Sequence, residues 1–407
     1  MSEPVTVLGL SAAQIAADGA YWTAREIAQQ PQLWREIAQR VAGDKALAGF
    51  LQQQRMDEPR RVVLTGAGTS SFIGECLAPA LARHSCGHVQ AIPTTDIVAS
   101  PDSWLVRDTP TLVVHFARSG NSPESVAAME LAEHSIDRCC HLVITCNGQG
   151  ELYKRAGAMR CAYALLLPEA SNDQSFAMTS SFTGMLLAAA MALQVLPADA
   201  ARAPRIAATG TQVLNSCLPL LMSLVRAGFE RVVYLGSKEL KGLAREAALK
   251  MLELTDGRVI AIADSPLGFR HGPKTILNGS TLVVVFLSND AHARRYELDL
   301  FSELGRDGVA GRVIALTGAE NGAVPGDKLV LSEDAAGFSD LELCLPYAIF
   351  AQALGMLRSA SSIAATLSGL LPERAKCTIS VGTWRTSKLP GLATMSVVAM
   401  ASARDQP

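Results

Sequence analysis

The sequence predicts an α/β protein built from two tandem doubly wound parallel-sheet domains, preceded by an N-terminal helical segment. Short β-branched runs such as residues 62–65 (VVLT) and 111–116 (TLVVHF) alternate with Ala- and Leu-rich stretches of helical length. This alternation recurs later in the chain at a constant offset. The two observations together favour a duplicated α/β unit over a single large domain.

The composition limits the possible classes of protein. The chain has 407 residues, of which 49% are hydrophobic and 18% charged, and its formal net charge is −2. A chain so rich in apolar residues can bury a core in each of two or three domains, which excludes intrinsic disorder. No basic block or stripe is present to neutralise phosphates, so we expect no nucleic-acid partner.

The N-terminal segment, residues 1–50, is expected to be helical. Pro31 lies within it and is expected to break the helix in two, because proline lacks the backbone N–H that a helix interior needs. The apolar positions that favour helix are Tyr21, Ile27, Leu33, Trp34, Ile37 and Val41.

Three sets of residues recur 170 positions apart. Val232-Val233 and Gly236 follow Val62-Val63 and Gly66 at this offset, and the run from Thr281 and the pair Val313-Ile314 follow Thr111 and Val143-Ile144. Three matches in one register favour a duplication, and the alternative is two unrelated α/β domains of similar size.

The duplication suggests boundaries for the domains. We expect a first domain over 51–205, a second over 206–370 and a tail over 371–407, with a boundary in the Pro- and Ala-rich connector near 195–210. The stretch Phe176–Ala198 has no charged residue, but its polar and proline positions favour a buried helix over a membrane span.

Nine cysteines form no CxxC pair. We expect them to be reduced, buried thiols of a cytoplasmic protein, and neither a disulfide framework nor a zinc site. The N-terminus lacks the cationic start of a secretory signal. We therefore expect no metal and no membrane contact.

Two glycine- and hydroxyl-rich turns follow the predicted strands of the first copy. The first contains Gly68, Thr69 and Ser70 and opens a helix, whose free N–H groups suit an anion. A dinucleotide fingerprint would require glycine where Ser71 stands, and a P-loop would require a lysine that is absent. The turn therefore favours a small phosphate ester and no nucleotide cofactor, although such a turn also caps ordinary helices.

The second turn contains Arg118, Ser119 and Ser122. Ser122 followed by Pro123 is a typical helix start. Arg118 and Ser119 exceed what a cap requires, and the two turns follow strands whose ends meet at one edge of a parallel sheet. We therefore expect them to form a phosphate cradle.

The second copy contributes titratable groups. Glu246, Lys250 and Glu253 are spaced to lie on one helix face, where a solvated salt bridge is the ordinary alternative. His271 lies in a loop between Arg270 and Gly272-Pro273, which can present the imidazole to a ligand, although most single histidines are structural.

These residues carry a resemblance to the double sugar-isomerase (SIS) domain family, whose domains have a flavodoxin-like fold. The chain is most similar to the bacterial tagatose-6-phosphate ketose/aldose isomerases, also described as galactosamine-6-phosphate deaminase/isomerases. The resemblance covers roughly residues 20–357. It rests on Glu26-Ile27, Gln30-Pro31, Gly68 to Ser70, Thr94 to Val98, Ser119-Gly120, Ser175 to Phe182, Arg245 to Glu253, His271 to Pro273 and Leu345 to Gln352.

The resemblance implies a role for each candidate. The turn residues Gly68, Thr69, Ser70, Ser119 and Ser122 would hold the sugar phosphate, and Arg118 stands where the related synthase has glutamine. Glu253 would carry a proton between C1 and C2, and His271, supplied by a neighbouring subunit, would open the sugar ring. Glu246 and Lys250 would orient those groups. A homo-oligomer with a shared active site is therefore implied, and no cofactor.

Two other functions are possible from the sequence. The fold can also serve as a phosphosugar sensor without turnover, and a nicotinamide dehydrogenase is a distant third. Glu253 and His271 favour catalysis. Beyond about Leu357 the resemblance stops, so no tail lysine is assigned to the site; a changed reading frame or a divergent tail explains this equally.

Overall fold

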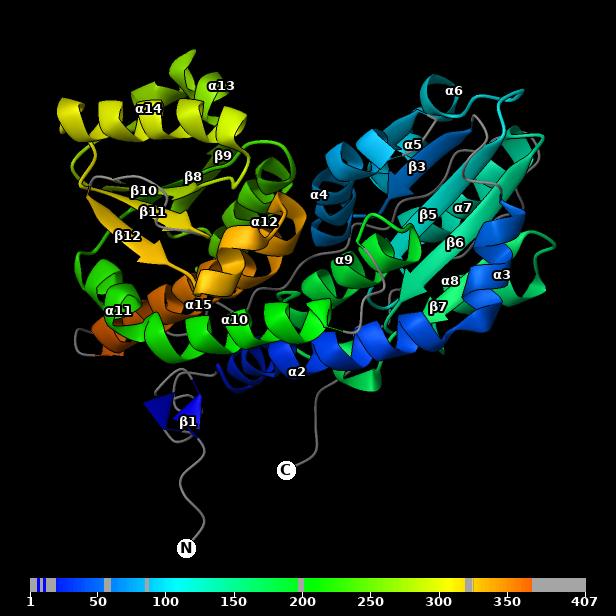
Figure 1. The fold of residues 1–407 in the computed structure, drawn as a ribbon, viewed down its shortest axis with the longest axis horizontal. Helices are drawn as coiled ribbons and strands as arrows, with labels where there is room; N and C mark the ends of the chain where they lie inside the picture. Colours follow the sequence, from blue (N-terminus) through cyan, green and yellow to red (C-terminus); the bar gives the residue numbers. More distant parts are fainter. Residues whose placement is uncertain are drawn as a thin grey trace, which may run out of the picture. The chain divides into compact units, whose positions relative to one another are not determined.

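The computed structural model contains two five-stranded parallel sheets. It describes residues 20–54, 60–84, 88–196, 201–318, 324 and 326–359, the backbone of the last helix to Leu367, and the short paired strands β1 (Thr6–Val7) and β2 (Leu10–Ser11). The predicted tail lies outside the described residues apart from that helix. Figure 1 shows the two sheets with helices around them.

The first sheet has the strand order β4-β3-β5-β6-β7, with all pairs parallel. Helices cover both of its faces, as they do in a doubly wound sheet. Its strands are β3 (Arg61–Thr65), β4 (Val89–Ala91), β5 (Thr111–Ala117), β6 (Cys139–Thr145) and β7 (Ala162–Leu166); the helices of this part are α4 (Thr69–His84), α5 (Thr94–Ala99), α6 (Pro101–Trp104), α7 (Pro123–Ser135), α8 (Glu151–Ala158), η1 (Glu169–Ser171) and α9 (Ser180–Ala192).

The second sheet repeats this order as β9-β8-β10-β11-β12, again entirely parallel. Its strands are β8 (Arg231–Leu235), β9 (Ile260–Asp264), β10 (Thr281–Phe286), β11 (Arg312–Thr317) and β12 (Asp327–Val330); its helices are α10 (Arg202–Ser216), α11 (Leu218–Arg226), α12 (Glu239–Leu254), α13 (Pro266–Arg270), η2 (Pro273–Ile276), α14 (Ala291–Asp307), η3 (Glu333–Gly337) and α15 (Asp340–Leu367). β8 and α12 begin and end 170 residues after β3 and α4. The predicted duplication is therefore confirmed in strand order and in register.

The N-terminal segment corrects one prediction. Helix α2 (Tyr21–Gly43) runs through Pro31 without a break, and α3 (Lys45–Gln53) follows it. Proline deprives the carbonyl of Ile27 of its usual N–H partner. The side-chain amide of Gln30 donates to this carbonyl at 3.1 Å instead. The helix therefore ends later than expected, at Gly43, where Asp44 caps α3 by accepting from the Leu47 N–H.

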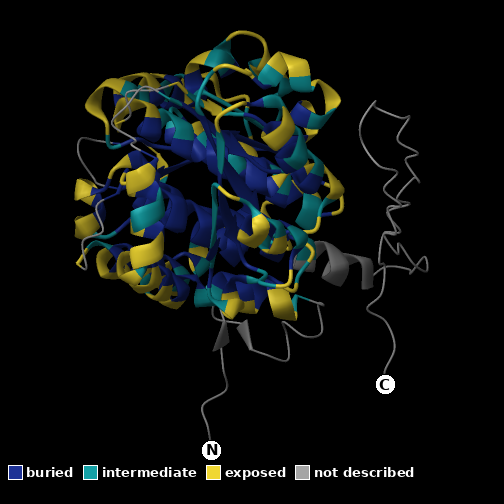
Figure 2. Ribbon diagram, turned by 90° about the vertical axis from the view of Figure 1, so that its right-hand side faces the viewer, coloured by how far each residue is buried: buried dark blue, intermediate teal, exposed yellow. Residues whose placement is uncertain are grey.

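One apolar core connects the two sheets. It includes one face of each sheet together with residues of α2, α4, α9, α12 and α15. Figure 2 shows the buried residues concentrated in the interior and the exposed ones on the outer helices and loops. Every residue of α9 is buried, which confirms the predicted core helix within Phe176–Ala198.

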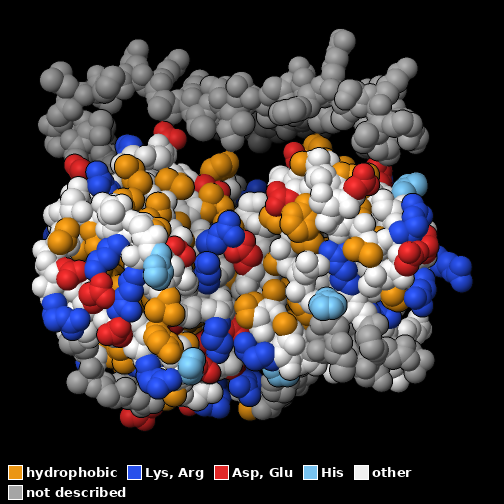
Figure 3. Space-filling view, turned by 90° about the horizontal axis from the view of Figure 1, so that it is seen from above, with side chains coloured by type: hydrophobic (Ala, Val, Ile, Leu, Met, Phe, Trp, Pro, Cys, Tyr) orange, Lys and Arg blue, Asp and Glu red, His pale blue; other side chains and the backbone are white. Residues whose placement is uncertain are grey.

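Within the described residues, α15 is long and apolar enough over Asp340–Ser359 to cross a membrane, and the bent pair α10–α11 passes the same test only as a pair. The apolar window of α15 is completely buried, as expected for a core helix. On the face drawn in Figure 3, acidic, basic and apolar side chains are interspersed.

The prediction of reduced thiols is wrong for one pair of cysteines. Cys140 and Cys161 form a disulfide between the neighbouring strands β6 and β7. Their Cα atoms are 4.9 Å apart because His141 pairs with Ala162, which brings the preceding residues opposite each other. The described cysteines that remain free are Cys76, Cys139, Cys146, Cys217 and Cys344.

Candidate functional site

The first hydroxyl-rich turn joins β3 to α4 at the carboxyl edge of the first sheet. Gly68 has a φ of +55°, a backbone conformation that side chains rarely adopt, so glycine suits this position. Thr69 and Ser70 are buried at the first turn of α4. Within the described part of the chain, no side-chain hydrogen bond occupies the Ser70 hydroxyl. The turn therefore presents a donor beside a helix N-terminus, as an anion site requires.

The second turn follows β5, the neighbour of β3 in the sheet. Ser122 caps α7, because its hydroxyl oxygen accepts from the Ser125 N–H at 3.2 Å, which confirms the predicted helix start. Ser119 is exposed. Arg118 reaches away from the turn and donates to the backbone carbonyl of Ser175 at 2.9 Å. The two predicted turns thus lie at the ends of adjacent strands.

The titratable cluster lies on α12. Lys250 is completely buried, and its ammonium forms an ion pair with Glu253 and lies 3.6 Å from a carboxylate oxygen of Glu246. The solvated salt bridge that the spacing also allowed is therefore not what forms. Neither carboxylate oxygen of Glu246 has a hydrogen-bond partner among the described residues. Burial raises the pKa of Glu246 to about 8, against the opposing charge of Lys250.

Helices α4 and α12 pack against each other and bring the two halves of the site together. The Thr69 side chain interacts with the Glu246 carboxylate and favours its charged form. The helices approach closely at Gly242, where a Cβ atom would lie 2.6 Å from the backbone nitrogen of Cys76. Residues separated by more than 170 positions thus share one site because α12 has no side chain at this contact.

A loop that sequence reasoning had not assigned to the site completes its wall. Glu26 accepts from the N–H groups of Gln174 and Ser175, at 2.5 and 3.1 Å. Asp173 accepts from the N–H groups of Thr179 and Ser181, at 2.8 and 2.9 Å. These two carboxylates and Arg118 hold the loop beside the second turn.

The two carboxylates left different traces in the sequence. Asp173 stands six residues before the Thr179-Ser180-Ser181 run that opens α9, which is a capping pattern that the sequence carries. Glu26 belongs to a motif of the resemblance, but its contact with a loop about 150 residues away has no local signal.

The corresponding edge of the second sheet is filled by the protein's own carboxylates. Asp340 accepts from the Ser288 hydroxyl at 2.6 Å and from the Asn289 N–H at 3.0 Å, and it lies 3.3 Å from the Lys238 ammonium. Glu297 accepts from the Ser288 N–H at 2.7 Å. Oxygen anions therefore already occupy the donors of this copy, whereas the first copy keeps its turn open.

His271 does not join the cluster on α12. It lies exposed at the end of α13, and within the described residues no side-chain hydrogen bond or ion pair connects it to Glu253. The other candidates come together at one edge of the first sheet. His271 is the one predicted site residue that the fold of a single chain leaves apart from them.

Comparison with known proteins assigns the chain to a family. The SIS domain matches residues 56–195. The AgaS protein of Streptomyces coelicolor is 47% identical over 348 residues, which cover 84% of this chain and 89% of that protein. The chain belongs to the SIS-domain family. The D-galactosamine-6-phosphate deaminase AgaS of Escherichia coli O157:H7 is 42% identical over 84% of this chain and 90% of its own length.

A solved SIS-domain structure agrees with the fold of the whole described chain. The tagatose-6-phosphate ketose/aldose isomerase of Escherichia coli superposes with a TM-score of 0.80 and 40% identity, over 89% of this chain and 96% of that one. The duplicated α/β architecture is therefore that of a double SIS-domain protein, as the sequence motifs implied.

Proposed function

We propose that this chain converts galactosamine 6-phosphate and water into tagatose 6-phosphate and ammonia. One observation carries the proposal: the buried Glu246–Lys250–Glu253 cluster of the second domain meets the hydroxyl-rich turn of the first domain at Thr69. The names of relatives that are 42–47% identical support the choice of substrate.

The phosphate end of the substrate belongs at the edge of the first sheet. Thr69, Ser70 and Ser119 supply hydroxyls there, and the N-termini of α4 and α7 supply free N–H groups and a favourable dipole. Arg118, anchored on the Ser175 carbonyl, contributes a positive charge beside them. In the second copy, Asp340 and Glu297 already occupy the equivalent donors, so we assign one phosphosugar to each chain.

Proton transfer is assigned to Glu253. Aldose–ketose interconversion moves a proton between C1 and C2, and one carboxylate on one face of the sugar can remove and return it. Lys250, which touches Glu253, can stabilise the oxyanion that develops in the enediol or enolamine. Glu246 has unpaired oxygens for a sugar hydroxyl, and its raised pKa lets it donate as an acid near neutral pH.

Ring opening is assigned to His271. Opening a hemiacetal moves a proton between two oxygens, a task that suits an imidazole near neutral pH. Because His271 is exposed and lies apart from the α12 cluster, we assign this step to the His271 of a second copy of the chain. The complete site would then form only in a homo-oligomer.

The same groups serve isomerisation and deamination. When C2 carries an amine, the proton shift yields an imine at C2, and water adds to it and releases ammonia. When C2 carries a hydroxyl, the shift yields the ketose directly. The substituent on the substrate therefore selects between the two outcomes.

The first test measures ammonia and ketose released from galactosamine 6-phosphate, with glucosamine 6-phosphate compared in parallel. We expect equal amounts of both products from the galacto substrate and a much lower rate from the gluco epimer. Binding of galactosamine 6-phosphate without release of either product would refute the enzyme and favour a phosphosugar sensor. Ketose formation from the aldose 6-phosphate without any deamination would limit the activity to isomerisation.

A further inference from the structure

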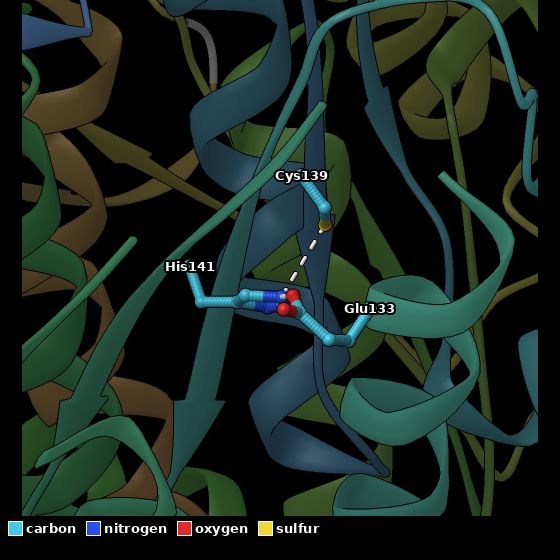
Figure 4. Close-up of side chains that lie close together, drawn as sticks. All are labelled: Glu133, Cys139 and His141. Atoms are coloured by element: carbon cyan, nitrogen blue, oxygen red, sulfur yellow. Dashed lines mark hydrogen bonds and ion pairs between the residues drawn. The ribbon is translucent and has the colours of Figure 1, made fainter. Parts of the chain in front are cut away.

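A cluster of three ligand-type side chains lies at the amino edge of the first sheet, at the opposite ends of the strands from the candidate site. Glu133 stands in the last turn of α7, and Cys139 and His141 begin β6. The Nε2 atom of His141 lies 3.0 Å from a carboxylate oxygen of Glu133 and 3.3 Å from the sulfur of Cys139. Figure 4 shows the carboxylate and the sulfur approaching the imidazole.

The three groups are arranged as metal ligands are. All three potential ligand atoms lie within 4.8 Å of one another. Zinc bonds of about 2.0–2.3 Å at tetrahedral angles place nitrogen and oxygen or sulfur ligands roughly 3.3–3.6 Å apart. The observed separations from His141 are close to these values, so an ion could enter with small side-chain movements.

A second histidine orients the first. The Nδ1 atom of His141 lies 2.9 Å from Nε2 of His115 on the neighbouring strand β5, and the two rings stack at 5.2 Å. Metal-binding histidines characteristically have their other nitrogen held in this way, which directs the lone pair of the first toward the ion. Burial lowers the pKa of both imidazoles, so both are in the neutral form that binds metals.

We infer that Glu133, Cys139 and His141 form a zinc site that fastens the end of α7 to the start of β6. Thiolate, imidazole and carboxylate together are a typical ligand set for Zn²⁺. On binding, the thiol of Cys139 releases its proton to solvent and the thiolate forms the metal–sulfur bond. The C-terminal end of α7 carries a partial negative charge, which also favours a cation there.

The surroundings leave room for a fourth ligand. Glu133 and Cys139 line a pocket of about 970 Å³ that also includes Asp137, Arg138 and Cys140. The pocket provides an entry path and space for a water molecule as the fourth ligand. The disulfide partner Cys140 points to the other face of the sheet, since it packs with the central core whereas Cys139 packs with the α5–α7 side.

The position of the site indicates a structural role. Helix α7 begins at the second hydroxyl-rich turn and ends at the metal cluster. An ion that holds its far end would stabilise the helix whose N-terminus faces the candidate phosphate position. This inference does not depend on the proposed substrate.

The test uses the purified full-length chain, stripped with a chelator without any reductant so that the Cys140–Cys161 disulfide persists. Co²⁺ is titrated as a spectroscopic probe and then displaced by Zn²⁺. We expect one ion per chain, a thiolate-to-cobalt charge-transfer band, and a higher Tm with Zn²⁺. Cys139→Ser should abolish the band, and Glu133→Gln should weaken binding at least about 10-fold.

Two matched controls separate the site from other cysteines and carboxylates. Glu130→Gln changes a carboxylate one turn earlier on α7, which pairs with Arg155, and Cys217→Ala removes a buried thiol in the other domain. Both should bind Co²⁺ like the wild type. A charge-transfer band that persists in Cys139→Ser, or binding that requires reduction of the disulfide, would overturn the inference, as would the absence of stoichiometric binding.

Discussion

Arg245 on α12 forms an ion pair with Glu75 on α4, the residue that precedes it by 170 positions. The offset is that of the duplication, so the pair joins equivalent positions of the two copies across their shared helix interface. The copies therefore face each other about an approximate two-fold axis between α4 and α12.

The two ends of this interface have diverged. Glu239 stands 170 residues after Thr69, and it forms an ion pair with Arg83, which stands 170 residues before Glu253. The Glu239 end is thus closed by a pair of opposite charges. At the other end, Thr69 faces the carboxylates of α12, and Glu246 keeps unpaired oxygens. One approximate two-fold interface therefore yields a single open site.

Replacing Glu253 by Gln should abolish turnover. The amide keeps the size of the side chain but cannot remove a proton, so we expect kcat to fall by at least about 10²-fold with phosphosugar affinity largely retained. Steady-state kinetics and calorimetry measure both quantities. Asp256→Asn is the matched control, because Asp256 is an exposed carboxylate just beyond the same helix. A wild-type rate in Glu253→Gln would show that another group carries the proton.

Mixing two inactive variants should restore activity if His271 acts across subunits. In a random dimer of His271→Ala and Glu253→Gln chains, half of the molecules are mixed and each has one intact site. We expect recovery to about a quarter of the wild-type rate after co-expression. If His271 serves its own chain, the co-expressed sample will be no more active than the separate variants.

Glu246 should make stability fall as pH rises toward 8. Burial raises its pKa from 4.5 to about 8, so between these values the folded state holds a proton that the unfolded state releases. The contribution of this group to the free energy of unfolding therefore decreases with rising pH, by at most about 1.4 kcal/mol per pH unit. Glu246→Gln removes this slope. Denaturation curves of both proteins from pH 5 to 8 should converge or cross; parallel curves would contradict the assignment.

Gly242→Ala should separate α4 from α12. The added methyl group would lie 2.6 Å from backbone nitrogen of Cys76, and relief of that clash must move a helix. We expect a loss of about 1–3 kcal/mol in the free energy of unfolding, together with reduced activity. Gly49→Ala in α3 is the control, since its Cβ would meet no atom within 4 Å and alanine should stabilise that helix slightly.

Arg118→Gln should raise KM more than it lowers kcat. Glutamine can still donate to the Ser175 carbonyl but carries no charge for phosphate, and a group that binds substrate and transition state equally changes KM alone. We expect an increase of about 10-fold in KM. Arg107→Gln removes an exposed arginine that pairs with Asp137 and should leave KM unchanged. A fall in kcat with constant KM would place Arg118 in the chemical step instead.

Local patterns in the sequence account for much of the fold. Alternating β-branched and helical runs predict the doubly wound sheets, and the constant offset predicts their duplication, because both depend on periodicities within a few tens of residues. The spacing of Glu246, Lys250 and Glu253 predicts that they share a helix face, as it does in the structure. The hydroxyl-rich turns likewise appear where strands were expected to end.

Contacts between distant segments decided the rest. The Cys140–Cys161 disulfide depends on the register of β6 against β7, and the intact helix at Pro31 depends on the amide of Gln30. The sequence by itself determined which elements form and which side chains share a face, because neighbouring residues set backbone periodicity. Only the tertiary structure decided that Lys250 is buried and that Glu246 meets Thr69, because burial and charge pairing depend on the close packing of α4 against α12.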